Sequence, residues 1–62
     1  MSQFAKVSKD GNEYDISSQR YDVGTYVCIQ QKGRLVDQFG IGCSFDDFLK
    51  SMIKDGFEVI TI

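Results

Sequence analysis

The 62-residue chain has no histidine, and its only cysteines are Cys28 and Cys43. A structural zinc ion normally takes four cysteine or histidine ligands, so a single chain of this composition is not expected to hold one. General acid–base catalysis needs convergent groups in a pocket, and histidine supplies them most often. A domain of this size has little room for such a pocket. We therefore expect no enzyme and no cofactor.

Other absences narrow the setting in which the protein works. The chain has no proline, which excludes a semi-rigid proline-rich linker, and its apolar runs are too short to span a bilayer. Seven basic and nine acidic residues are mixed along the chain, which argues against binding a polyanion or a membrane surface by bulk charge. No segment resembles a signal peptide. We expect two reduced thiols and a cytoplasmic protein.

The length predicts a single small domain spanning residues 1–62. A chain of this size buries only about 60% of its unfolded surface. Its core typically supplies about 3–5 kcal/mol. With 42% hydrophobic residues, the composition is that of a folded globular domain. Association with a second subunit is the most natural source of additional stability.

One helix is predicted near the C-terminus. Ser44 is a suitable N-cap, and Asp47, three residues later, can reach back to the Ser44 amide. Gly56 supplies the left-handed residue at which helices stop, and residues 57–62 are then rich enough in β-branched residues to form a strand. Five residues at helical spacing form an apolar stripe on this helix: Phe45, Phe48, Leu49, Met52 and Ile53.

The first hairpin is predicted with its register. Asp10-Gly11 is a two-residue turn signal. This turn places four apolar residues on one face, with an ion pair between Lys6 and Asp15 on the other. The predicted pairs are Lys9 with Asn12, Ser8 with Glu13, Val7 with Tyr14, Lys6 with Asp15, Ala5 with Ile16, and Phe4 with Ser17.

Residues 19–24 read as a polar connection, followed by a second hairpin formed by residues 25–31 and 34–41 around Lys32-Gly33. A two-residue loop would pair Ile29 with Val36 and Tyr26 with Phe39. A three-residue loop would instead pair Ile29 with Leu35 and Cys28 with Val36. Because a slip of one residue exchanges the two faces, the register stays open.

These elements predict an α+β fold: a four-stranded antiparallel meander made of two hairpins, one helix packed on the sheet, and a C-terminal fifth strand. The short connections around the helix make the fifth strand antiparallel to the first. We expect it to pair at the free edge of the first strand.

A single short helix can cover only one face of a sheet, yet the strands offer apolar residues to both faces. We expect the uncovered face to bind a partner, either a second copy of the chain in a homodimer or another protein. The candidate partner-binding residues are Tyr21, Tyr26, Phe39, Ile60 and Ile62.

Three local motifs have simpler interpretations than a site. Cys43 lies beside a helix start, but no histidine can activate it. Residues 40–44 resemble a phosphate loop, but no lysine stands at the helix start and Asp46 and Asp47 oppose an anion. The acidic run at residues 10–15 lacks the spacing of a calcium loop.

The predicted function is therefore that of a small acidic protein-binding domain. Its size and charge suit a regulator or inhibitor of another protein, such as the inhibitors of nucleic-acid enzymes that mobile genetic elements encode. The alternative is a protein that binds single-stranded nucleic acid by stacking bases on its sheet. The residues that would serve this alternative are Tyr14, Tyr21, Tyr26 and Phe39, interleaved with Lys6, Arg20, Lys32 and Arg34.

Overall fold

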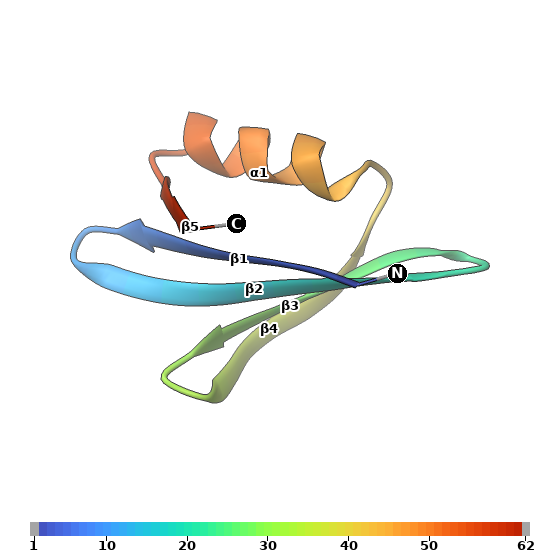
Figure 1. The fold of residues 1–62 in the computed structure, drawn as a ribbon, viewed down its shortest axis with the longest axis horizontal. Coiled ribbons are helices and arrows are strands. Elements are labelled where there is room, and N and C mark those ends of the chain that lie inside the picture. Colours follow the sequence, from blue (N-terminus) through green and yellow to red (C-terminus); the bar gives the residue numbers. More distant parts are fainter. Residues whose placement is uncertain (1, 62) are drawn as a thin grey trace.

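A computed structural model describes residues 2–61 and shows one five-stranded sheet with one helix across it (Figure 1). The strand order is β4-β3-β2-β1-β5, and every neighbouring pair is antiparallel. The α+β meander predicted from the sequence is confirmed, including the place of the last strand beside the first. The elements are β1 (Ser2–Lys9), β2 (Asn12–Tyr21), β3 (Gly24–Gln31), β4 (Arg34–Ile41), α1 (Phe45–Lys54) and β5 (Glu58–Thr61).

The hairpin of β1 and β2 has the predicted register at every predicted pair. Asp10 and Gly11 both adopt positive φ angles, 54° and 82°, as a tight two-residue hairpin turn requires. On the outer face, Lys6 Nζ lies 3.8 Å from Asp15 Oδ1 and 3.9 Å from Glu13 Oε1. On the inner face, Ala5, Val7 and Ile16 are fully buried.

The connection predicted over residues 19–24 is wrong. β2 continues to Tyr21 and β3 begins at Gly24, so Asp22 and Val23 alone form the turn. Gln19 pairs with Tyr26, and Tyr21 pairs with Gly24. The hairpin extends beyond the helix at this end, so its polar residues are solvated while its backbone remains paired.

The hairpin of β3 and β4 follows neither predicted register along its whole length. The turn is the two-residue Lys32-Gly33 turn, and Gln30 pairs with Leu35 beside it. The register then shifts by one residue, because Val36 is an extra residue without a partner. Beyond this bulge Val27 pairs with Phe39.

The helix α1 begins as predicted. Ser44 Oγ accepts a hydrogen bond from the Asp47 backbone N–H at 3.1 Å; within residues 2–61, no reciprocal bond from Asp47 to the Ser44 amide is found. Gly56 follows the helix with a φ of 103°. Ile53 is 53% exposed and does not belong to the buried stripe. At 100° per residue it lies about 90° from the centre of that stripe.

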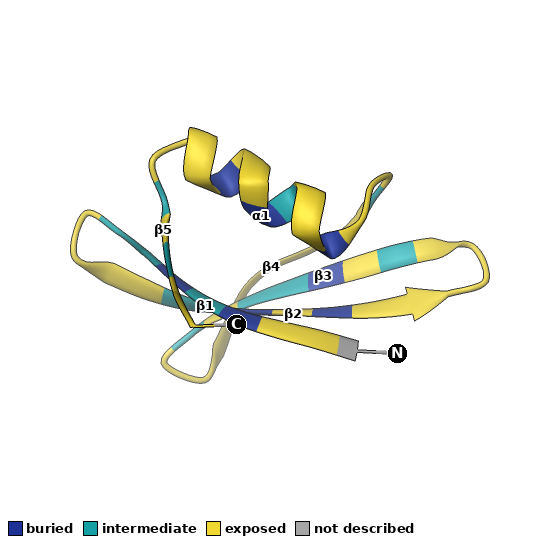
Figure 2. Ribbon diagram, turned by 45° about the horizontal axis from the view of Figure 1, so that its top comes forward, coloured by how far each residue is buried: buried dark blue, intermediate teal, exposed yellow. Residues whose placement is uncertain are grey.

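The core lies between α1 and the strands β1, β2 and β3. Figure 2 shows buried positions on the lower side of the helix and in the middle of the sheet. Phe48 and Phe39 extend this core, with ring centres 5.8 Å apart. The buried apolar residues are Ala5, Val7, Ile16, Val27, Phe45, Leu49 and Met52.

Lys9 joins the first hairpin to the end of the helix. Its Nζ donates a hydrogen bond to the Asp55 carbonyl oxygen at 2.9 Å and lies 5.0 Å from the centre of the Phe57 ring. The last carbonyl groups of a helix lack intrahelical partners and carry partial negative charge. A lysine at this place supplies both the hydrogen bond and the opposite charge.

We expect the Ser44→Ala substitution to lower the free energy of unfolding by about 0.5–2 kcal/mol, because the cap of the Asp47 amide is lost. Leu49→Ala removes a buried side chain and is expected to cost about 2–5 kcal/mol. Urea denaturation measures both changes. Ile53→Ala is the matched control on the same helix, and a cost equal to that of Leu49→Ala would contradict the described packing.

The Lys9→Met variant keeps an apolar chain of similar length but loses the charge. We expect it to unfold with a free energy about 1 kcal/mol lower, because the bond to the Asp55 carbonyl and the contact with the Phe57 ring are lost. Lys50→Met, at an exposed site on the helix, serves as the control and is expected to change stability by no more than about 0.5 kcal/mol. Equal effects in urea melts would show that the Lys9 contact contributes nothing.

Candidate functional site

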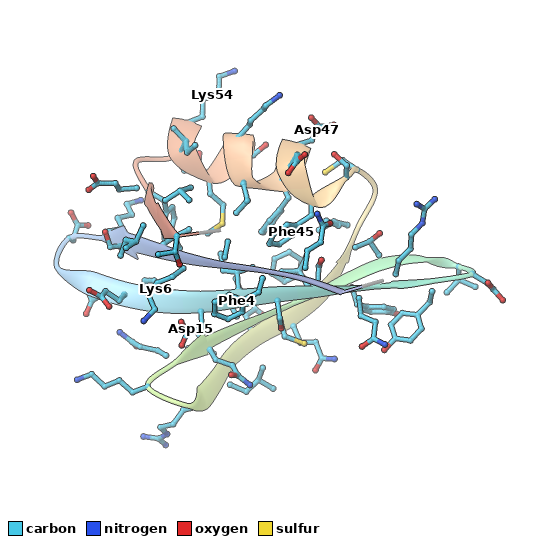
Figure 3. The ribbon with its side chains drawn as sticks, viewed as in Figure 1. Phe4, Lys6, Asp15, Phe45, Asp47 and Lys54 are labelled. Atoms are coloured by element: carbon cyan, nitrogen blue, oxygen red, sulfur yellow. The ribbon has the colours of Figure 1, made fainter. Side chains whose placement is uncertain are left out.

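No other described element covers the sheet face opposite α1 (Figure 1). In Figure 3, Phe4, Lys6 and Asp15 lie on this side of the sheet, whereas Phe45 lies between helix and sheet. We call this surface the open face. Strand alternation and the registers assign to it Phe4, Lys6, Asp15, Ser17, Gln19, Tyr21, Tyr26, Cys28 and Gln38.

Aromatic side chains dominate one half of the open face. Phe4 is 51% exposed, Tyr21 50% and Tyr26 43%. The two tyrosine rings meet edge to face, with centroids 5.8 Å apart at an angle of 75°. A Cβ added at Gly40, opposite Tyr26, would lie 3.8 Å from Tyr26 Cε1, so the ring reaches across β4 where a side chain is missing.

The two tyrosines border a hollow of about 470 Å³. Tyr21, Tyr26 and Val23 form its apolar end. Cys28 and Gln38, from β3 and β4, line it together with polar residues of β2. An apolar recess with a few polar groups at its border is the kind of surface that accepts a side chain from a partner.

The other half of the open face is charged. Lys6 lies between Glu13 and Asp15, and all three border a second hollow of about 300 Å³ that also contacts Gln31 and Lys32. The ion pairs are partly exposed, so they contribute little to stability. They leave both signs of charge available at the surface.

The predicted partner-binding residues divide among several places. Tyr21 and Tyr26 lie on the open face, as described above. Phe39 does not: the bulge at Val36 turns it toward α1, where it packs against Phe48. Ile60 is exposed on the edge strand β5 at a second register shift, and Ile62 lies outside the described residues.

Phe4 was missing from the predicted site, although its pairing with Ser17 had already assigned it to the outer face.

The four aromatic residues of the nucleic-acid alternative do not lie on one face of the sheet. Tyr14 packs against Phe57, and Phe39 packs against Phe48, so both belong to the helix side. Only Tyr21 and Tyr26 of the four remain on the open face.

The remaining motifs lie apart from the open face or contribute single residues to it. Cys28 and Cys43 are both free thiols; Cys28 is half-buried on the open face and Cys43 is exposed before α1. Within residues 2–61, no three potential metal-ligating side chains gather. No helix in that part of the chain is long and apolar enough to cross a membrane.

No protein-family model, curated protein or solved structure matches the chain.

Proposed function

We propose that the protein acts by binding protein, without catalysis, and that the open face is its binding surface. The observation that carries this proposal is the pair of exposed rings of Tyr21 and Tyr26 at an apolar hollow on an uncovered sheet face, which also exposes Phe4. Contiguous exposed apolar patches are uncommon on monomers and mark interaction surfaces. Tyrosine in particular is enriched at protein interfaces.

The partner that we propose is a second copy of the chain. The accessible surface is 4554 Å², whereas a compact monomer of 7.0 kDa exposes roughly 4,000 Å². The excess of about 500 Å² means that the chain is less compact than a typical monomer, and burying about 500 Å² on each subunit would give an interface of about 1,000 Å², near the lower limit for specific association. A two-fold arrangement would bury this area in a closed dimer.

The charges of the open face suit this arrangement. Lys6 lies beside Glu13 and Asp15, so the surface offers both signs within one small area. In a two-fold dimer each patch meets its own copy, and a patch of mixed charge can pair with itself where a patch of one sign would repel.

The wider role that we propose is regulation or inhibition of another protein in the cytoplasm, where two thiols stay reduced. Sixty-two residues with no histidine suit a binding surface better than a catalytic site. The acidic balance, with a net charge of −2, would suit a basic groove such as those of nucleic-acid enzymes.

Sedimentation equilibrium of the Tyr26→Glu variant tests the proposed surface. A charge beside the apolar hollow is costly to bury, so we expect a dimer that forms at roughly 10–100 µM to dissociate. Ile53→Glu places the same charge on an exposed apolar residue of α1, outside the open face, and is expected to leave the dimer intact.

Two results would contradict the proposal. One is a wild-type protein that stays monomeric at these concentrations and captures no protein through Tyr26. The other is a folded Tyr26→Glu variant that associates as the wild type does. Salt-dependent binding to single-stranded oligonucleotides, lost in Tyr26→Glu, would favour the nucleic-acid alternative instead.

A further inference from the structure

A second group of polar side chains gathers on the other side of the sheet, beneath the start of α1. Two hollows there, of about 190 and 450 Å³, are both lined by Arg20 from β2, Thr25 from β3 and Ser44 at the helix cap. Arg20 and Thr25 are cross-strand partners, and Ser44 comes from a distant part of the sequence. The fold therefore brings a cation and two hydroxyl groups to one helix N-terminus.

Ser18 adds a buried hydroxyl group to the smaller hollow. The residue is 5% exposed, and the register directs its side chain to the helix side of the sheet, beside Val27. Within residues 2–61 its hydroxyl is hydrogen-bonded to no other residue. No described side-chain N or O atom is both fully enclosed and without a partner, so the Ser18 hydroxyl is not sealed off completely, and on the helix side the residue lines the smaller hollow.

The helix start contributes donors of its own. Ser44 Oγ accepts the Asp47 N–H and the Ser44 carbonyl accepts the Phe48 N–H, which leaves the amides of Phe45 and Asp46 without intrahelical partners. The Ser44 hydroxyl can still donate its own hydrogen. The aligned peptide dipoles place a partial charge of about +0.5 at this end of the helix.

Arg20 supplies the full charge. Among the described residues the salt bridges involve Lys6 alone, so the Arg20 guanidinium has no carboxylate partner. Arginine presents a planar fork of N–H donors that matches the geometry of phosphate oxygens. Arg20 on β2 thus supplies the positive charge that a phosphate-binding loop normally takes from a lysine at the helix start.

We propose that these groups form a binding site for a phosphate monoester. Arg20, Ser18, Thr25, Ser44 and the free amides of α1 offer more donors than a planar carboxylate can accept, whereas a phosphate has enough oxygens for them. The positive charge, one guanidinium plus about half a charge from the helix, matches the −1.5 to −2 of a monoester near neutral pH.

Asp46 and Asp47 do not occupy the site. Neither residue lines the two hollows, and Figure 3 shows Asp47 on the side of α1 that faces away from the sheet. Both carboxylates are exposed, so their repulsion of a phosphate is screened by water and salt. They weaken binding, and the Asp46→Asn variant is expected to bind phosphate more tightly.

Titration of ¹⁵N-labelled wild-type protein with phenyl phosphate at constant ionic strength tests the site by NMR. We expect the amides of Phe45 and Asp46 and the Arg20 Nε–H to shift together, with a dissociation constant of roughly 1–10 mM. Arg20→Gln is expected to weaken binding about tenfold or more, and Ser18→Ala about threefold to tenfold.

Two matched variants separate this site from general charge effects. Arg34→Gln removes an exposed arginine at the far end of the sheet, and Ser51→Ala removes an exposed hydroxyl in the second half of α1. Both are expected to bind as the wild type does. Equal weakening by Arg34→Gln and Arg20→Gln, or no localised shifts in the wild type, would overturn the proposal.

Two further ligands identify what is recognised. Inorganic phosphate binding as tightly as phenyl phosphate would identify free phosphate as the ligand, whereas tighter binding of phenyl phosphate would point to a phosphorylated molecule. Dimethyl phosphate carries one charge and two blocked oxygens and is expected to bind at least tenfold more weakly than phenyl phosphate, a difference of about 1.4 kcal/mol. Equal binding of the diester would overturn recognition of a monoester.

Discussion

A single ten-residue helix has to provide the whole second layer of this domain. Its three buried residues, Phe45, Leu49 and Met52, close over the fully buried Val7, Ile16 and Val27. Because the helix covers only part of one sheet face, three further features of the fold follow. One sheet face becomes a core, the other stays open, and the β2–β3 hairpin extends beyond the helix into solvent. The bond from Lys9 to the end of α1 holds this one layer to the sheet over 46 residues of sequence.

The parts of the fold that local chemistry determines could be predicted from sequence. Asp10-Gly11 accepts few turn geometries, so one dipeptide gave the complete register of the first hairpin. Ser44 and Gly56 likewise marked the two ends of the helix. The bulge at Val36 could not be predicted, because it leaves no signature in residue type and is favoured by the packing of Phe39 against Phe48.

The candidate sites were likewise predicted only in part. Tyr21 and Tyr26 were predicted to lie on the uncovered face, and the structure places both on the open face. Phe39 was predicted there too, but the extra residue in β4 turns it to the helix side. The group around Arg20 was hidden for a different reason. Residues 19–24 were predicted to be a loop, and only the pairing of Arg20 with Thr25 places Arg20 at the hollows that Ser44 also lines.

The two outermost strands, β4 and β5, share one feature: each carries a register shift, at Val36 and at Ile60. An unbroken, flat edge strand is a template on which further strands can add without limit. An extra residue in each edge interrupts that row of free N–H and C=O groups. Addition of further strands is thereby hindered at both edges of the sheet. A molecule with one uncovered face can then form a dimer through that face without growing into a fibre.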